Sequence, residues 1–156
     1  MKPTLNIGTD RALEKIKHFC GYQERNHREV KEKLFSFGLY KDQIETLISV
    51  LIQEDYLNEE RYAMAFARGK FRMKGWGKIK IKYELKQQQI SDYCIKKALQ
   101  AIEEEDYIQA FTKVFDEKIK TLKSEKNIFI KKKKLQSFLL QRGFESFLIS
   151  EKLNKL

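Results

Sequence analysis

Basic side chains gather in one short stretch of this sequence, from Arg68 to Lys86. The stretch holds eight Lys or Arg residues and one acid, Glu84, which gives it +7 of the chain's net charge of +10. Cations that are not interspersed with acids attract polyanions or acidic protein surfaces. We therefore predict a binding surface here, with these contact residues: Arg68, Lys70, Arg72, Lys74, Trp76, Lys78, Lys82 and Lys86.

Two sets within this stretch recur every four residues. Lys78, Lys82 and Lys86 would share one face of a helix. Arg68 and Arg72 would form a similar pair on the preceding helix. A row of lysines is often no more than a solvated face. Here the scarcity of acids favours contact with a partner, because surface helices usually mix both signs.

Trp76 lies between two glycines in the middle of the basic stretch. Its ring either stacks on a base or fills a pocket of a partner, or it packs into the angle between two helices, where large aromatics more often lie. The sequence that follows, Gly77-Lys78-Ile79, lacks the Lys-Ser or Lys-Thr pair of a phosphate-binding loop. The glycines are therefore expected to form a turn.

A second basic run covers Lys131, Lys132, Lys133 and Lys134 and precedes the apolar Leu135. Four consecutive residues point all around a helix, so they do not form one stripe. Two roles are open for this run: a solvated helix start, and an auxiliary binding patch.

The sequence shows no residue set typical of catalysis or metal binding. His18 and His27 have no partner at metal-ligand spacing, and no nucleophile has a matching base. The acids from Glu103 to Asp106, at the junction of the second and third units, are interpreted as a helix end and cap, and they do not indicate paired catalytic carboxylates. We therefore expect no enzymatic activity, no cofactor and no metal.

The composition favours helices throughout the 156 residues, because Pro occurs once and Gly seven times. Cys20 and Cys94 lack CxxC spacing and are expected to be reduced. The chain has no signal-peptide pattern and no run of eighteen apolar residues. We expect a soluble cytoplasmic protein without a membrane segment.

Apolar spacing and capping residues predict three helices in the first third of the chain. The first begins with Asp10 as its N-cap. The second begins at Asn26, where Glu29 completes a capping box, and stops at Gly38. The third covers residues 41–54.

The same apolar pattern then recurs twice, at offsets of 51 and 54 residues. The positions in register are Val30, Leu34, Leu39 and Ile44; Ile81, Leu85, Ile90 and Ile95; Leu135, Leu139, Phe144 and Ile149. Gly38, Gln89 and Gly143 fall at the turn. We predict an all-α chain of three tandem three-helix units, residues 1–56, 57–102 and 103–156, in an elongated array, straight or curved. A monomer is expected, because no long apolar stripe remains once the cores are assigned.

Three segments carry a resemblance to a known family. They read LNEERYAMAF at residues 57–66, KGWGKIKIKYELKQQQI at 74–90 and LLQRGF at 139–144. Their order and spacing resemble the RecX family of recombinase regulators. The resemblance implies binding to RecA filaments on single-stranded DNA in DNA repair. It also implies inhibition of ATP hydrolysis, strand exchange and the SOS co-protease activity.

Two positions depart from the family pattern. Asn58 and Glu59 stand where the family prefers paired aspartates, and Asn26 stands where it commonly has Ser. Both asparagines can still cap a helix, so the departures affect contacts of the acidic pair more than the fold. Arg61, in the helix that Asn58 begins, is placed to pair with the neighbouring unit.

A different class of function, a helix-turn-helix transcriptional regulator, is the alternative, because helix, turn and helix recur three times. In the first unit the recognition helix would bring Asp42, Glu45 and Glu54 toward phosphates, which argues against it. Non-specific, salt-dependent binding to single-stranded DNA through the basic stretch is expected under either function.

Overall fold

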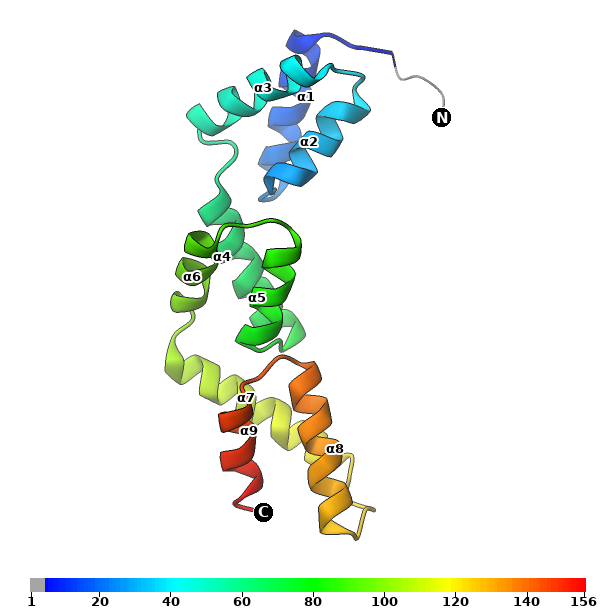
Figure 1. Cartoon of the computed structure of the whole chain (residues 1–156), viewed down its shortest axis with the longest axis vertical. Helices are drawn as coiled ribbons and strands as arrows, with labels where there is room; N and C mark the ends of the chain where they lie inside the picture. Colours follow the sequence, from blue (N-terminus) through cyan, green and yellow to red (C-terminus); the bar gives the residue numbers. More distant parts are fainter. Residues whose placement is uncertain (1–4) are drawn as a thin grey trace.

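Nine α-helices and no strand make up residues 5–156, the part of the chain that this computed structural model describes. The helices are α1 (Thr9–Tyr22), α2 (His27–Ser36), α3 (Lys41–Gln53), α4 (Glu59–Gly69), α5 (Lys78–Gln87), α6 (Asp92–Gln100), α7 (Glu104–Lys120), α8 (Ile128–Gln141) and α9 (Ser146–Leu153). A π-helical turn, η1 (Lys70–Lys74), extends α4. Three groups of three helices follow one another along an elongated molecule (Figure 1). The predicted all-α array of three-helix units is confirmed.

The three units have the same internal order. In Figure 1 the second and third helices of each unit lie toward the viewer, and the first helix lies behind them. All twelve apolar positions of the repeat are buried. The turn residues Gly38, Gln89 and Gly143 have φ of 80°, 64° and 91°. The turn therefore keeps its left-handed backbone at Gln89 as well, although this conformation is strained for a residue that has a side chain.

Capping explains where several helices begin. Asn26 Oδ1 accepts from the backbone N–H of Glu29 at 2.8 Å, and Glu29 Oε1 accepts from the backbone N–H of Asn26 at 3.1 Å, as the capping box predicts. Asn58 Oδ1 accepts from the N–H of Arg61 at 2.9 Å. These polar starts orient α2 and α4.

The predicted start of α1 was wrong by two residues. Gly8 is the N-cap, with φ of 86°, and its N–H donates to Asn6 Oδ1 at 2.8 Å. Asp10 lies in the first turn instead, where a carboxylate still suits the positive end of the helix dipole. α1 thus begins at a glycine, without the side-chain cap that the sequence pattern assigned to Asp10.

The apolar core has two parts. One cluster lies within the N-terminal unit and runs from Ala12 to Leu57. The other runs from Tyr62 to Leu153, so the middle and C-terminal units share a single core. We propose 1–56, 57–102 and 103–156 as the three domains, with Leu57 crossing the first border because its side chain packs in the N-terminal core.

The joint between the N-terminal and middle units is polar. Arg61 Nε lies 2.6 Å from Glu24 Oε1, and its Nη1 lies 3.0 Å from Asp55 Oδ2. The expected pairing of Arg61 with the neighbouring unit is confirmed. Asn26 Nδ2 also donates to Gln88 Oε1 at 3.4 Å. This joint relies on directional polar contacts, whereas the next one adds a shared apolar core.

Candidate partner interface

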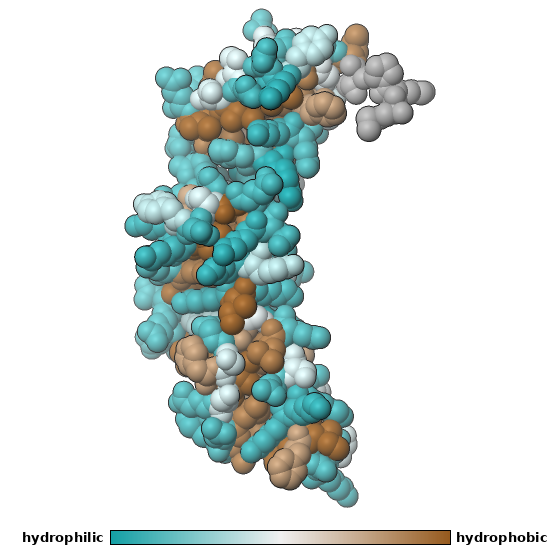
Figure 2. Space-filling view, viewed as in Figure 1, coloured by the Kyte–Doolittle hydropathy of each residue, from teal (hydrophilic) through white to brown (hydrophobic). Residues whose placement is uncertain are grey.

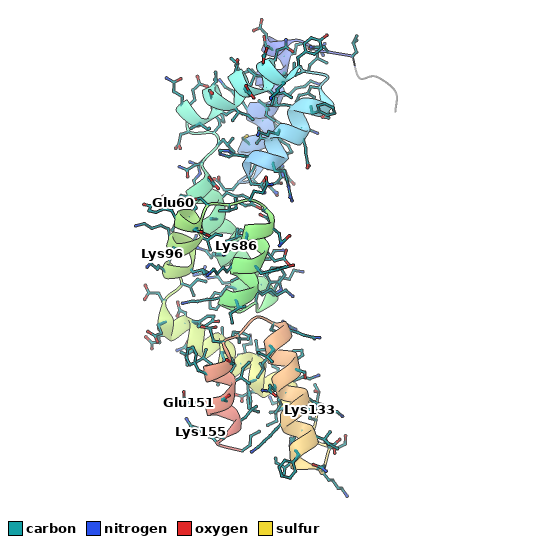
Figure 3. All side chains as sticks on the ribbon, viewed as in Figure 1. Glu60, Lys86, Lys96, Lys133, Glu151 and Lys155 are labelled. Carbon is teal, nitrogen blue, oxygen red and sulfur yellow. The ribbon has the colours of Figure 1, made fainter. Side chains whose placement is uncertain are left out.

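The lysine row of the middle unit lines one groove between α5 and α6. Lys78, Lys82 and Lys86 border a cleft of about 400 Å³, together with Lys96 from α6. Figure 3 labels Lys86 and Lys96 on the viewed face of the middle unit. The four-residue spacing therefore brings the three predicted lysines together. The groove they form faces the same way as the front helices of the other units.

Lys96 was not among the predicted contact residues. It directly follows Ile95, the buried repeat position on α6, so it projects at the edge of the groove. The repeat register supplies the signal that could have found it, because Lys96 occupies the position equivalent to Glu45 in the first unit. A lysine in the middle unit thus occupies the position of a glutamate in the first unit, and this difference makes the middle groove more basic.

One acid lies in this groove. Lys86 Nζ is 3.9 Å from Asp92 Oδ1, and both side chains are largely exposed. Such an exposed pair contributes little to stability and is easily exchanged for another partner. Among the described residues, no carboxylate lies within 4 Å of the ammonium groups of Lys78, Lys82 or Lys96. The groove therefore presents cations that are available to an anionic partner.

Trp76 is half-buried and packs against the shared core. Its ring meets Phe66 edge-on, with centroids 6.3 Å apart. The ammonium groups of Lys70 and Lys80 lie 5.1 and 4.5 Å from the Trp76 ring centroid. Trp76 thus packs between helices and holds two lysines, rather than standing free as a stacking platform. Lys80, which the predicted contact set omitted, belongs to this cluster.

The arginine pair lies elsewhere. Arg68 and Arg72 line a narrow cleft of about 190 Å³ with Glu103 and Asp106, at the start of α7. Arg72 lies in η1, which is a π-helical turn, yet both arginines line this one cleft, so the predicted pair stays together. The turn ends at Gly75, whose φ is 66°. The arginines therefore do not share the lysine groove.

Lys74 is exposed at the end of η1, and its carbonyl oxygen accepts from Arg142 Nη1 at 2.6 Å. The C-terminal unit thus fixes the backbone of Lys74 and leaves its ammonium group in solvent. Among the predicted contact residues, Lys74 is neither in the lysine groove nor in the Trp76 cluster.

The second basic run, residues 131–134, lies near the start of α8. Lys131 and Lys132 are half-buried, and Lys133 and Lys134 are exposed. Lys134 Nζ lies 3.5 Å from Glu125 Oε2. In Figure 3, Lys133 lies on the C-terminal unit, well away from Lys86 and Lys96. The run therefore does not extend the lysine groove.

One position of the lysine row is apolar in both outer units. The position of Lys86 corresponds to Phe35 in the first unit and to Leu140 in the third, and these side chains are 66% and 47% exposed. Phe35 and Tyr40 border a groove of about 580 Å³ between α2 and α3. Phe147 on α9 is 67% exposed. Figure 2 shows hydrophobic strips over the upper and lower units, with hydrophilic side chains crossing the middle one.

Tyr107 anchors the first turn of α5. Its hydroxyl accepts from the backbone N–H of Lys78 at 2.9 Å and donates to the Glu145 carboxylate. Burial raises the pKa of Tyr107 far above its usual value, and the hydrogen bond to Glu145 raises it further. The phenol is therefore a permanent donor at neutral pH, and it joins the lysine-bearing helix to the C-terminal unit.

Within residues 5–156, no cluster of three or more His, Cys, Asp or Glu side chains has an arrangement that could hold a metal ion. None of the described helices has the length and apolar character needed to cross a membrane.

Comparison with known proteins gives a consistent family. The family model described as RecX, second three-helix domain, matches residues 58–99. The regulatory protein RecX of Thermotoga maritima is 31% identical over 152 residues, which cover 97% of this chain and 88% of the relative. That of Prosthecochloris aestuarii is 29% identical over 148 residues, 95% of both chains.

Solved structures agree in fold. The crystal structure of RecX from Lactobacillus salivarius superposes with a TM-score of 0.82 at 24% identity, covering 95% of this chain and 97% of that one. A second crystal structure of regulatory protein RecX gives 0.83 at 19% identity, covering 95% of this chain and 72% of that one. With the sequence relatives at and above 30% identity over nearly the full length, these findings show that the chain belongs to the RecX family of regulatory proteins.

Proposed function

We propose that this chain binds RecA filaments on single-stranded DNA through the face that carries the α5–α6 lysine groove, and thereby inhibits the recombinase. The inhibited activities are ATP hydrolysis, strand exchange and the SOS co-protease function. In this proposal the protein acts as a monomer in the cytoplasm. The observation that carries the proposal is the convergence of Lys78, Lys82, Lys86 and Lys96 on one groove at the centre of an elongated repeat array.

The arrangement of the face suits a partner built from repeated subunits. Three units present the same position in turn, as Phe35, Lys86 and Leu140. An elongated array offers a long surface rather than a deep pocket, so it can contact several copies of one partner. The basic centre would supply attraction to acidic groups or phosphates, and the apolar ends would fill pockets that exclude water.

The charges of the groove support association by electrostatic attraction. Three of its four lysines have no carboxylate partner among the described residues, and the fourth has an exposed one at 3.9 Å. Cations on a surface of one sign accelerate encounter with an anionic partner, and salt weakens them. Salt-dependent contact with the DNA strand inside the filament is part of this proposal.

The test is ATP hydrolysis by RecA on single-stranded DNA with substoichiometric amounts of the full chain. Lys78→Glu/Lys82→Glu/Lys86→Glu should abolish inhibition at unchanged helicity. Lys113→Glu/Lys120→Glu/Lys123→Glu is the matched control, because it makes the same charge change at exposed lysines of the C-terminal unit. The control should inhibit as the parent does. Equal inhibition by both variants would refute the assignment, and tight binding to one duplex sequence without inhibition would identify a transcriptional regulator instead.

A further inference from the structure

A spacious, open cleft lies in the N-terminal unit, along the outer surface of α1. It encloses about 1310 Å³, against about 400 Å³ for the lysine groove. Its lining residues are distinct from those of the α2–α3 groove. In Figure 1, α1 lies behind α2 and α3.

Charge is strongly separated around this unit. Residues 1–56 contain nine basic and nine acidic side chains, so the unit is neutral as a whole. Yet the cleft is lined by five Lys or Arg side chains and one carboxylate, Glu14. The acids of α3 that line the other groove, such as Glu45, do not reach it. The unit as a whole has no net charge, yet its cleft is positively charged and would attract a polyanion.

Three of the cations have no ion-pair partner in the described part of the chain. Lys17 lies 2.9 Å from Glu54, and Arg25 lies 3.7 Å from Glu29, so these two cations are already paired. Arg11, Lys15 and Lys33 are exposed and have no carboxylate within 4 Å.

Lys15 and Lys33 both lie beside the ring of Phe37. From α1 and α2 respectively, their ammonium groups lie 5.8 and 5.7 Å from the Phe37 ring centroid. Neither ammonium group has a carboxylate to balance its charge, so both would gain from an added anion.

Aromatic side chains accompany these cations. Tyr22, at the end of α1, is 79% exposed, and no cation covers its ring among the described residues. Tyr56 borders the other side of the cleft. Lys17 Nζ already lies 5.3 Å from the Tyr56 ring centroid, so Tyr22 is the open ring. An exposed ring beside a row of cations is a feature with which proteins bind unpaired bases, since every base has a face that can stack. A duplex offers no such unstacked base.

We propose that the α1 cleft binds single-stranded nucleic acid, with phosphates held by Arg11, Lys15 and Lys33 and a base stacked on Tyr22. The site is independent of the proposed action on RecA filaments, since it requires no filament and is tested without RecA. It gives the protein a second strand-binding surface, separate from the lysine groove of the middle unit.

The first test is photo-crosslinking of the full chain to a thymidine oligomer that contains 5-iododeoxyuridine, with the crosslinked peptides identified by mass spectrometry. Crosslinks at Tyr22 or Tyr56 are expected. Crosslinks confined to residues 68–96 would overturn the proposal, because the middle unit alone would then hold the strand. The same experiment with a uridine oligomer distinguishes RNA from DNA, and stronger crosslinking by either one supports the site.

The second test is affinity, measured by fluorescence anisotropy over a range of salt concentrations. Tyr22→Ala should weaken binding about tenfold, the loss expected for one stacked base. The plot of log affinity against log salt has a negative slope. Lys15→Glu/Lys33→Glu should make this slope shallower by about 1.4, that is about 0.7 for each lost phosphate contact. Lys31→Glu/Lys41→Glu is the matched control, because it changes the same charge in the same unit but on the α2–α3 groove. Equal losses in both double variants would contradict the site, as would equal affinity for polyglutamate.

Discussion

The backbone N–H of Gly77 donates to the carbonyl oxygen of Arg142 across 2.7 Å, so a turn of the middle unit is bonded directly to a turn of the C-terminal unit. The N–H of Ile79 donates to the carbonyl oxygen of Gly143 at 3.0 Å. A Cβ on Gly77 would lie 2.3 Å from that same oxygen of Gly143. Residues 74–90 and 139–144, two of the segments that carry the family resemblance, therefore form a joint between the middle and C-terminal units. Here these segments have a structural role, which is to hold α5 and its lysines in place.

Replacing Gly77 by Ala should break this joint. The added methyl would collide with backbone, which cannot move aside as a side chain can. We expect a loss of about 2 kcal/mol in the free energy of unfolding, typical of a steric conflict in a packed region. Urea unfolding followed by circular dichroism measures it. Gly69→Ala is the control, because a Cβ there meets nothing within 4 Å and lies on a helix, so it should be neutral or stabilising. Equal stability of the two variants would show that the close approach is unimportant.

The buried phenol of Tyr107 should make stability depend on alkaline pH. Burial, followed by the hydrogen bond to Glu145, raises its pKa in the folded chain. In the unfolded chain the phenol ionises near pH 10, as tyrosine ordinarily does. The stabilising contribution is therefore complete below about pH 10 and is lost as pH rises above it, by up to about 1.4 kcal/mol per pH unit.

The comparison that isolates this effect is Tyr107→Phe. The variant should be less stable at pH 8, because the N–H of Lys78 and the carboxylate of Glu145 lose a partner. Above pH 10 the difference between the parent and the variant should shrink, since only the parent loses the contribution of Tyr107. Urea unfolding between pH 8 and 11 gives both curves. Parallel curves would mean that Tyr107 does not keep its proton in the folded chain.

The repeat register explains why so much of the fold could be predicted. Burial of Val30, Ile81 and Leu135 follows from apolar periodicity, which is a local property of the sequence. Asn26 and Asn58 cap helices by contacts within three residues, so these starts were also readable. Asp10 is not the cap because it already lies inside α1, which begins at Thr9 after Gly8.

The site was less predictable, because it depends on contacts between distant residues. Lys96 joins the groove from a different helix, α6. Arg68 and Arg72 stay together, as their spacing predicts, but the cleft they line also holds Glu103 and Asp106 at the start of α7, which no local pattern indicates. The net charge of the N-terminal unit is zero and does not tell where on its surface the cations lie. The cationic cleft could therefore not be predicted from the sequence.

The polar joint at Arg61 should govern the mobility of the N-terminal unit. Burial lowers the pKa of the guanidinium, but the hydrogen bond to Glu24 and the charges of Glu24 and Asp55 reverse this, so its pKa lies above the ordinary value. Arg61→Ala removes both pairs and leaves the shared apolar core intact. Hydrogen exchange should accelerate at residues 54–61 and stay unchanged across residues 62–153. Arg68→Ala, which removes an unpaired guanidinium from the same helix, is the control and should change neither. Faster exchange throughout the chain would contradict a local joint.

The apolar ends of the front face should contribute to inhibition independently of the lysines. Phe35 and Phe147 are exposed side chains of the two outer units, and each would fill a pocket of the partner. Phe35→Ala and Phe147→Ala should each weaken inhibition of RecA ATP hydrolysis about tenfold, which corresponds to about 1.4 kcal/mol. Because the two residues lie in different units, their effects should add in the double variant.

Tyr83→Ala is the matched control for these substitutions. Tyr83 is an exposed aromatic residue of α5 that does not line the lysine groove, so its removal should leave inhibition unchanged. If the double variant inhibits as the parent does while the triple lysine variant fails, the basic groove alone holds the partner. The outer units would then serve only to support the middle one. Loss of inhibition in both would require that all three units touch the partner at once, which an elongated repeat permits and a single compact site does not.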